Sequence, residues 1–322
     1  MLTRRSMLST CGAGFVCANL PRAVAQSDKK VVRIVVGVPA GSLPDLIARL
    51  LAERLRLPYA STVIVENKSS PRLAVEYVKN AEPDGTVLLF TPQGAIVLFP
   101  QTSRNPTYEP LRDLTPISPT FKSMLAFNIG PGVPESVRSL PDFLAWCKTN
   151  TNGATLGTVT GGPGHFLGFM LARTAGVQLT HVPYKGGLAA LQDVLGGHVA
   201  ACFTFITEVM SFAGSRTLRV LAVSGSRRSQ FLPDTPTLWE LGYNVAWDPW
   251  TGIFAPARIE PGTLRTLSAA TREVITSSEM ASHVGTLGAD PMFQSPEEFA
   301  ATIRADIERW GPVVKASGFV AN

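Results

Sequence analysis

Short apolar runs rich in β-branched residues alternate with amphipathic helical segments in the first third of this chain. The runs are residues 31–38, 62–66 and 86–91, and helical patterns occupy residues 45–55 and 74–81. Strand, helix, strand, helix, strand at these spacings predicts a parallel sheet with helices on both faces. Ligands of such sheets bind at the carboxyl ends of the strands. Residues 39–45 and 91–94 are therefore the first candidate ligand loops.

The same alternation returns between residues 122 and 250. We expect strands at 122–129, 155–160, 199–203 and 218–223, and a helix that begins at Ser139 with a capping-box pattern. Residues 100–120 are rich in proline and polar residues, so we expect a long connection there.

Residues 250–256 form a predicted strand that returns to the first unit, and three helical segments follow at 261–276, 278–285 and 296–316. The pattern predicts an α/β protein in which one lobe interrupts the other. We place the first lobe at 26–121 and 253–322 and the second at 122–252. Two crossing strands would form a hinge, and its closure would bury whatever lies between the lobes.

The amino terminus has the features of an export signal. Arg4 and Arg5 precede a small, apolar stretch, and Ala23-Val24-Ala25 is a small-x-small cleavage site. We expect a cleaved signal peptide at residues 1–25 and a periplasmic mature protein. Removing the signal lowers the formal charge from +5 to +2. No basic run suggests nucleic-acid binding, and no later apolar run approaches the ~20 residues that span a bilayer.

Residues 155–165, Thr-Leu-Gly-Thr-Val-Thr-Gly-Gly-Pro-Gly-His, read as a strand end that runs into the helix 166–175. Unpaired N–H groups and the helix dipole attract anions at such a start, and glycines allow close approach of the backbone. This turn is therefore a candidate anion site that needs no lysine. Residues 181–186 are a second stretch of this kind.

Cys147 and Cys202 both lie among apolar residues, which favours buried free thiols over a disulfide. The histidines at 181, 198 and 283 show no metal-ligand spacing, so we expect no metal site.

Several motifs in order resemble one family, the periplasmic solute-binding proteins of tripartite tricarboxylate transporters (the Bug family). They are Asn67, Pro83-Asp-Gly85, His181-Val-Pro-Tyr-Lys-Gly186, Leu195-Gly-Gly-His-Val199, Leu218-Arg-Val-Leu-Ala-Val223, Leu232-Pro-Asp-Thr-Pro-Thr237, Leu287-Gly-Ala289 and Ser295-Pro-Glu-Glu-Phe299. The resemblance covers essentially the whole mature chain. It implies a two-lobed type II periplasmic binding fold, capture of a small carboxylate and delivery to a membrane permease. It also implies a monomer with no catalytic residue and no cofactor.

The family's first loop, Pro-x-Gly-Gly-x-x-Asp, falls on residues 39–45, where Ser42 replaces a glycine. Thr204 stands where the family usually has an aspartate, and Ser69-Ser-Pro-Arg-Leu73 replaces Pro-Gly-Ala-Gly-Gly. Loss of the acid at Thr204 removes a partner for amino or hydroxyl groups, which makes an amino-acid ligand less favoured.

We expect one ligand carboxylate to lie against the 39–45 loop and the 158–165 turn, with Gln93 and Thr204 contacting the rest of the ligand. The candidate residues are Pro39, Ala40, Gly41, Ser42, Asp45, Gln93, Thr158, Thr160, Gly161, Gly162, His165, Tyr184, Lys185 and Thr204.

Five side chains near this expected site have alternative interpretations. His165 either contacts the ligand or orients its turn, and Lys185 faces either the cleft or solvent. Asp45 is expected to cap the first helix, because a carboxylate would repel an anion. Trp247 and Trp250 either form a wall of the cleft or pack in the core.

A different class of function is an NADP-dependent oxidoreductase. Gly162, Gly164 and Gly168 follow a strand and open a helix, as in a dinucleotide fingerprint. The next strand ends in Tyr184 and Lys185 rather than in an acid, which suits a 2′-phosphate.

Overall fold

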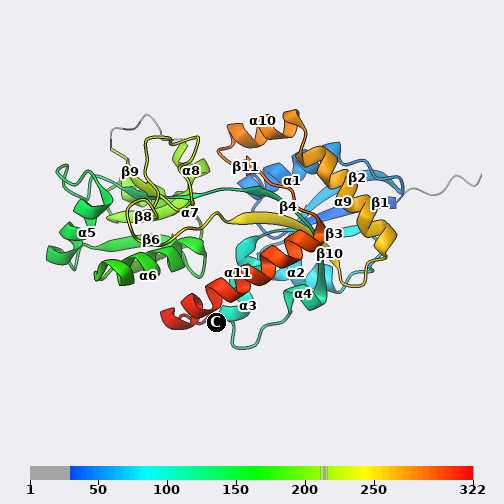
Figure 1. The fold of residues 1–322 in the computed structure, drawn as a ribbon, viewed down its shortest axis with the longest axis horizontal. Coiled ribbons are helices and arrows are strands. Elements are labelled where there is room, and N and C mark those ends of the chain that lie inside the picture. The colour runs from blue at the N-terminus through cyan, green and yellow to red at the C-terminus, as the bar shows by residue number, and fades with distance from the viewer. Residues whose placement is uncertain (1–29, 211, 213–214, 216, 322) are drawn as a thin grey trace, which may run out of the picture.

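The computed structural model describes residues 30–210, 212, 215 and 217–321, and the predicted signal peptide lies outside them. Two sheets form separate bodies that lie side by side (Figure 1). We call the body around the six-stranded sheet lobe 1 and the body around the five-stranded sheet lobe 2.

Lobe 1 has the strand order β11-β4-β10-β3-β1-β2. Its strands are β1 (Lys30–Val36), β2 (Ala60–Asn67), β3 (Val87–Pro92), β4 (Leu114–Lys122), β10 (Trp250–Pro256) and β11 (Asp290–Pro291). Its helices are α1 (Leu43–Arg54), α2 (Pro71–Lys79), η1 (Gly94–Leu98), α3 (Phe99–Thr102), α4 (Pro110–Asp113), α9 (Pro261–Ile275), α10 (Ser278–Thr286) and α11 (Pro296–Ser317). β1 is parallel to β2 and β3, whereas β10 is antiparallel to β3 and β4.

Lobe 2 has the strand order β7-β6-β8-β5-β9. Its strands are β5 (Leu125–Ile129), β6 (Thr155–Val159), β7 (Thr180–Tyr184), β8 (Ala201–Phe205) and β9 (Arg219–Val223). Its helices are α5 (Leu140–Thr149), α6 (Pro163–Ala175), α7 (Gly187–Leu195) and α8 (Ile206–Met210). β6 is parallel to β7 and β8, so these three strands end at the same edge.

The expectation of a long connection at residues 100–120 is wrong in its second half. Residues 114–122 form β4, which pairs with β10 along its whole length. Pro116 and Pro119 lie within β4, and its pairing with β10 shifts register at two points. Proline has no N–H to donate to a ladder and is tolerated where the ladder is irregular.

Local sequence predictions are confirmed at the start of α5 and at both cysteines. Ser139 with Asp142, and Ser295 with Glu298, form complete capping boxes at the starts of α5 and α11. Cys147 and Cys202 are buried and free.

Two strand segments connect the lobes. The chain leaves lobe 1 between β4 and β5 and returns at Pro249, just before β10, and the Ser123 N–H donates to the Pro249 carbonyl at 3.1 Å. Ser224 in lobe 2 supports both segments, because its Oγ accepts from the Leu125 N–H at 3.0 Å and donates to the Trp247 carbonyl at 2.5 Å.

The carboxyl-terminal helix α11 adds a third link between the lobes. It packs on β4, η1 and α3 in lobe 1 and on α6 in lobe 2 (Figure 1). A single cluster of buried apolar side chains accordingly includes Val35 and Phe254 of lobe 1 together with Phe127 and Phe166 of lobe 2. No helix within the described residues is both long and apolar enough to span a bilayer.

Candidate functional site

The carboxyl ends of the parallel strands in both sheets lie next to the crossing segments. In lobe 1, β3 and β4 point the same way, because both are antiparallel to β10, and β4 leads directly into the crossing. In lobe 2, the Ile206 N–H after β8 donates to the carbonyl of Met124 in the crossing at 3.0 Å. The strand-to-helix loops of the two lobes are therefore on edges that face each other.

The loop after β1 carries an exposed segment in front of α1. Pro39, Ala40 and Gly41 are exposed, and Gly41 has a φ of 81°. Ser42 occupies the N-cap position but makes no side-chain cap, because its Oγ donates to the Pro39 carbonyl at 2.7 Å. The first turn of α1 therefore keeps N–H groups that no N-cap side chain covers.

Asp45 stabilises the conformation of this loop. The sequence predicted that Asp45 would cap α1, but the N-cap position belongs to Ser42 and Asp45 lies in the first turn of the helix. Its buried carboxylate accepts from the Gly41 N–H at 2.8 Å and from Arg49 Nε at 3.0 Å. Asn67 Nδ2, at the end of β2, donates to the same carboxylate at 2.8 Å. Burial opposes ionisation, but these hydrogen bonds outweigh it and lower the pKa of Asp45. Asp45 is thus fully engaged in supporting the loop.

The turn after β6 is closed by its own hydrogen bonds. The Gly161 N–H donates to His165 Nδ1 at 3.2 Å, and the Gly162 N–H donates to the Val159 carbonyl at 3.0 Å. Thr160 is exposed, whereas Thr158 is fully buried and its Oγ1 has no partner among the described residues. Thr160 is consequently the hydroxyl of this turn that a ligand can reach.

His165 helps to fix the conformation of the turn, which is one of the two roles predicted for it. Its ring stacks on His181 with centroids 4.3 Å apart, and the Phe319 ring lies edge-on at 5.1 Å. Burial, helped by the neighbouring His181, lowers the pKa of His165 to about 4. The ring is therefore neutral at physiological pH and can accept the Gly161 hydrogen bond.

Gln93 lies in a buried hydrogen-bond network between the crossing segment and α11. Trp247 Nε1 donates to Gln93 Oε1 at 2.7 Å, and Gln93 Nε2 donates to Asp306 Oδ2 at 2.6 Å. Trp250 Nε1 donates to the same carboxylate oxygen at 2.8 Å. Both tryptophans are almost fully buried, which fits core packing better than a cleft wall.

The three remaining candidates differ in orientation. The Tyr184 hydroxyl donates to Asp193 Oδ2 at 2.5 Å, so this side chain lies along α7. Lys185 is exposed. Thr204 is buried, and its Oγ1 accepts from Asn128 Nδ2 at 3.1 Å. The structure brings the 39–42 loop and the 158–162 turn to facing edges, but it engages Gln93, Tyr184 and Thr204 in protein contacts.

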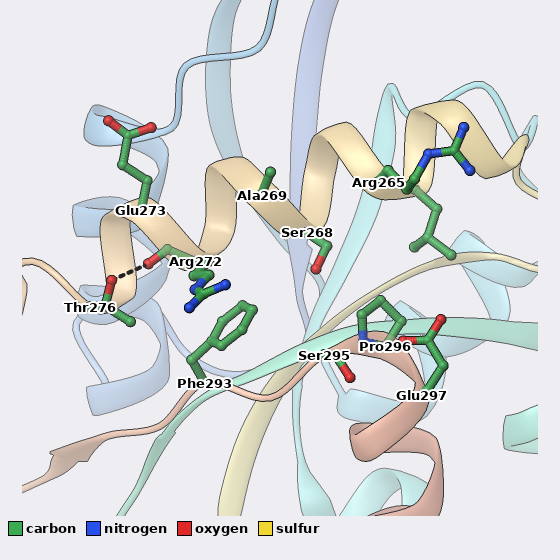
Figure 2. A pocket seen from close by; sticks show the side chains of 11 residues that line it. Arg265, Ser268, Ala269, Arg272, Glu273, Thr276, Phe293, Ser295, Pro296 and Glu297 are labelled. Atoms are coloured by element: carbon green, nitrogen blue, oxygen red, sulfur yellow. Dashed lines mark hydrogen bonds between the residues drawn. The ribbon is translucent and has the colours of Figure 1, made fainter.

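A concavity of about 500 Å³ lies elsewhere, on lobe 1 between α9 and the start of α11 (Figure 2). Arg272 extends over the Phe293 ring there, 5.7 Å from its centroid, and Arg265 and Glu297 stand at the same rim. No predicted site residue lines it, and it lacks the convergent loops of two lobes, so we place the candidate site between the lobes.

Two acids at the lobe junction were missed by the sequence reasoning. Asp306 lies inside α11, 213 positions from Gln93, and no local pattern marks it. Glu208 follows Thr204 by four residues, so the absence of the family aspartate at Thr204 is the sequence signal that points to it. Among the described residues no group of histidine, cysteine, aspartate and glutamate could hold a metal ion.

Two α/β lobes, two crossing segments and facing strand-to-helix loops define the class of two-lobed binding proteins. Residues 47–319 match the family model described as "Tripartite tricarboxylate transporter family receptor". The chain belongs to this family of periplasmic substrate-binding proteins. Among its relatives, protein BugT of Bordetella pertussis is 28% identical over 89% of this chain and 89% of that protein.

Solved structures agree with this assignment and confirm the predicted fold. "Periplasmic binding protein BugD" is 28% identical with a TM-score of 0.77, covering 91% of this chain and 99% of that one. Rpa4515 of R. palustris, solved with adipate, has a TM-score of 0.80 at 24% identity, with 90% of this chain and 97% of that chain covered, and shows the same fold.

Proposed function

We propose that this protein captures a small carboxylate between its two lobes and delivers it to the membrane permease of a tripartite tricarboxylate-type transporter, without catalysing a reaction. The observation that supports the proposal is that two strand-to-helix loops, one from each lobe, lie on edges that face each other. The exposed loop 39–42 precedes α1, and the turn 158–162 precedes α6.

Main-chain amides are the donors that this site can offer to an anion. The basic side chains near the end of β2 are already paired: Arg49 with Asp45, and Lys68 with Glu66 at 2.6 Å. A carboxylate between the lobes would instead meet the amino-terminal turns of α1 and α6, where the helix dipole favours negative charge. Hydrogen bonds to a carboxylate are roughly twice as strong as neutral ones.

Gly164 and Gly168, which suggested the alternative dinucleotide-binding function, are explained by helix packing. A Cβ at Gly168 would clash with Leu156, and one at Gly164 would lie 2.9 Å from the Cβ of Phe203. Both glycines therefore allow α6 to pack closely on β6 and β8, and they need no cofactor to explain them. Family membership likewise favours binding over oxidoreduction.

The proposal also covers the export of the protein to the periplasm and its oligomeric state. The family is periplasmic, and the twin-arginine-like start with Ala23-Val24-Ala25 supports export with a cleaved signal. We propose that the mature protein is a monomer that closes around its ligand. Amino-terminal sequencing of protein recovered from the periplasmic fraction tests the cleavage after Ala25.

A thermal-shift screen of the mature protein against mono-, di- and tricarboxylates tests the function. A ligand at 100 times its dissociation constant stabilises the folded state by about 2.7 kcal/mol, so at least one carboxylate should raise the melting temperature clearly. Native mass spectrometry then identifies ligand carried through purification. A rise with NADPH alone, and with no carboxylate, would favour the oxidoreductase and contradict the proposal.

A further inference from the structure

Glu208 is an acid placed at the edge of lobe 2 that faces lobe 1. It lies in α8, directly after β8, and it is only partly exposed. The neighbouring Thr207 touches lobe 1, because a Cβ added at Gly288 would lie 3.3 Å from its Cα. Gly288 belongs to the segment between α10 and β11. Glu208 is therefore at the junction of the lobes and not on an outer face.

The Glu208 carboxylate occupies the start of α7. Its Oε2 accepts from the Phe205 N–H at 3.2 Å, and the Leu188 backbone in the first turn of α7 also hydrogen-bonds to it. A side chain at Gly187 would collide with this carboxylate, while the N-cap Gly186 supplies no side-chain cap of its own. Glu208 thus takes the position at which a helix of nine residues would attract an external anion.

This position adjoins the proposed ligand turn. β6 and β7 are paired neighbours up to Val159 and Tyr184, so the start of α7 follows the strand next to the 158–162 turn. A ligand that reached along this strand edge from the turn would bring a second carboxylate to the neighbouring helix start. When it is ionised, the Glu208 carboxylate repels that second carboxylate, and it already engages the amides that could bind one.

We propose that Glu208 is a specificity-determining residue, an inference that rests on the proposed function. It allows ligands with one carboxylate to bind and excludes a second carboxylate from lobe 2. A neutral or cationic end is tolerated at the same place. The inference concerns the class of ligand, and it separates this chain from binding proteins that accept dicarboxylates.

Pairs of acids that share a carbon skeleton and differ in having one or two carboxylates test the role of Glu208. Isothermal titration at pH 8 compares butyrate with succinate, hexanoate with adipate, and benzoate with terephthalate, and 6-aminohexanoate gives the cationic end. The proteins are the mature wild type, Glu208→Gln and Glu208→Ser. Glu135→Gln is the control, because Glu135 is exposed and sits near Gly132, which contacts Gly197 at the opposite end of α7. Melting curves establish that each variant is folded.

In the wild type we expect the monocarboxylate of the preferred pair to bind at least tenfold more tightly than its dicarboxylate. Glu208→Gln and Glu208→Ser should reduce that ratio tenfold or more, and Glu135→Gln should leave it unchanged. A wild type that binds the dicarboxylate equally well, or folded neutral variants with an unchanged ratio, would overturn the role of Glu208 while the proposed function stands. Binding of no acid at all would instead remove the proposed function.

Discussion

Polar side chains at the facing edges differ in whether the protein already satisfies them. Asp45, Gln93 and Thr204 have protein partners, whereas the Thr160 side chain is exposed. Glu208 is satisfied by backbone donors but at the expense of burying a carboxyl group. The two residues that invite direct tests are therefore Thr160 and Glu208.

Thr160→Val should weaken ligand binding by about 1–3 kcal/mol if the hydroxyl donates to the bound carboxylate, since a charged acceptor would lose one bond. Titration calorimetry with the best ligand of the screen measures this loss. Thr151→Val, an exposed change in the turn before β6, is the matched control. An unchanged dissociation constant in Thr160→Val would remove that hydroxyl from the site.

Burial raises the pKa of Glu208 to about 7 from an ordinary value of 4.5. A carboxyl whose pKa is higher in the folded state binds more protons there, so its contribution to stability is complete below pH 4.5 and is lost as the pH rises through 7. Wild-type protein should therefore lose more stability between pH 5 and pH 8 than Glu208→Gln does. Urea unfolding at several pH values measures both slopes, and parallel slopes would contradict the buried carboxyl.

Contacts between residues distant in the sequence explain which side chains could be predicted. The exposed 39–42 loop and the 158–162 turn follow from local patterns of strand, glycine and helix, and the structure places both at facing edges. The partners of Gln93 and Glu208 lie on other elements, so their roles depend on tertiary packing that no local pattern encodes.

Among the elements, α11 packs on parts of both lobes. It begins with a complete capping box, ends at Gly318 in the left-handed region and runs from lobe 1 to α6 of lobe 2. The residue beyond its end, Phe319, lies against His165 and Phe166 with ring centroids at 5.1 and 6.2 Å. The segment after α11 therefore packs against the turn of lobe 2 that contains His165.

Phe319→Ala should lower the free energy of unfolding by about 1–2 kcal/mol, less than a core phenylalanine because the ring is partly exposed. It should also weaken ligand binding, since Gly161 and His165 lose the ring that packs on them. Val320→Ala changes an exposed neighbour and serves as the control. Equal free energies of unfolding of the two variants in urea would show that the Phe319 side chain does not stabilise the turn.

β4 shows where element prediction fails. Its sequence, Leu-Thr-Pro-Ile-Ser-Pro-Thr-Phe-Lys, contains two prolines and no clean alternation, and these features favour a loop. The strand exists because β10 and β11 pair on either side and bury it. By contrast, the apolar run of β10 predicted its bounds correctly, because burial on both faces leaves a continuous signal.

In the whole molecule, the Gln93, Trp247, Trp250 and Asp306 network ties the crossing segment to lobe 1. Asp306→Ala would leave the Trp250 and Gln93 donors without an acceptor inside the protein, and each unsatisfied donor costs about 1–3 kcal/mol. We expect a total loss of about 2–4 kcal/mol in urea unfolding, with a smaller loss for Asp306→Asn, which keeps an acceptor. Glu308→Ala, an exposed change on the same helix, should have little effect. Matching losses at 306 and 308 would contradict the network.

The stacked indoles of Trp247 and Trp310 have their centroids 3.5 Å apart, and one belongs to the crossing segment while the other belongs to α11. We expect a change in the angle between the lobes to alter the overlap of these rings, because the crossing segment and α11 both connect the lobes. Their ultraviolet emission therefore supplies a built-in optical reporter, with which stopped-flow mixing can time lobe motion without any attached dye.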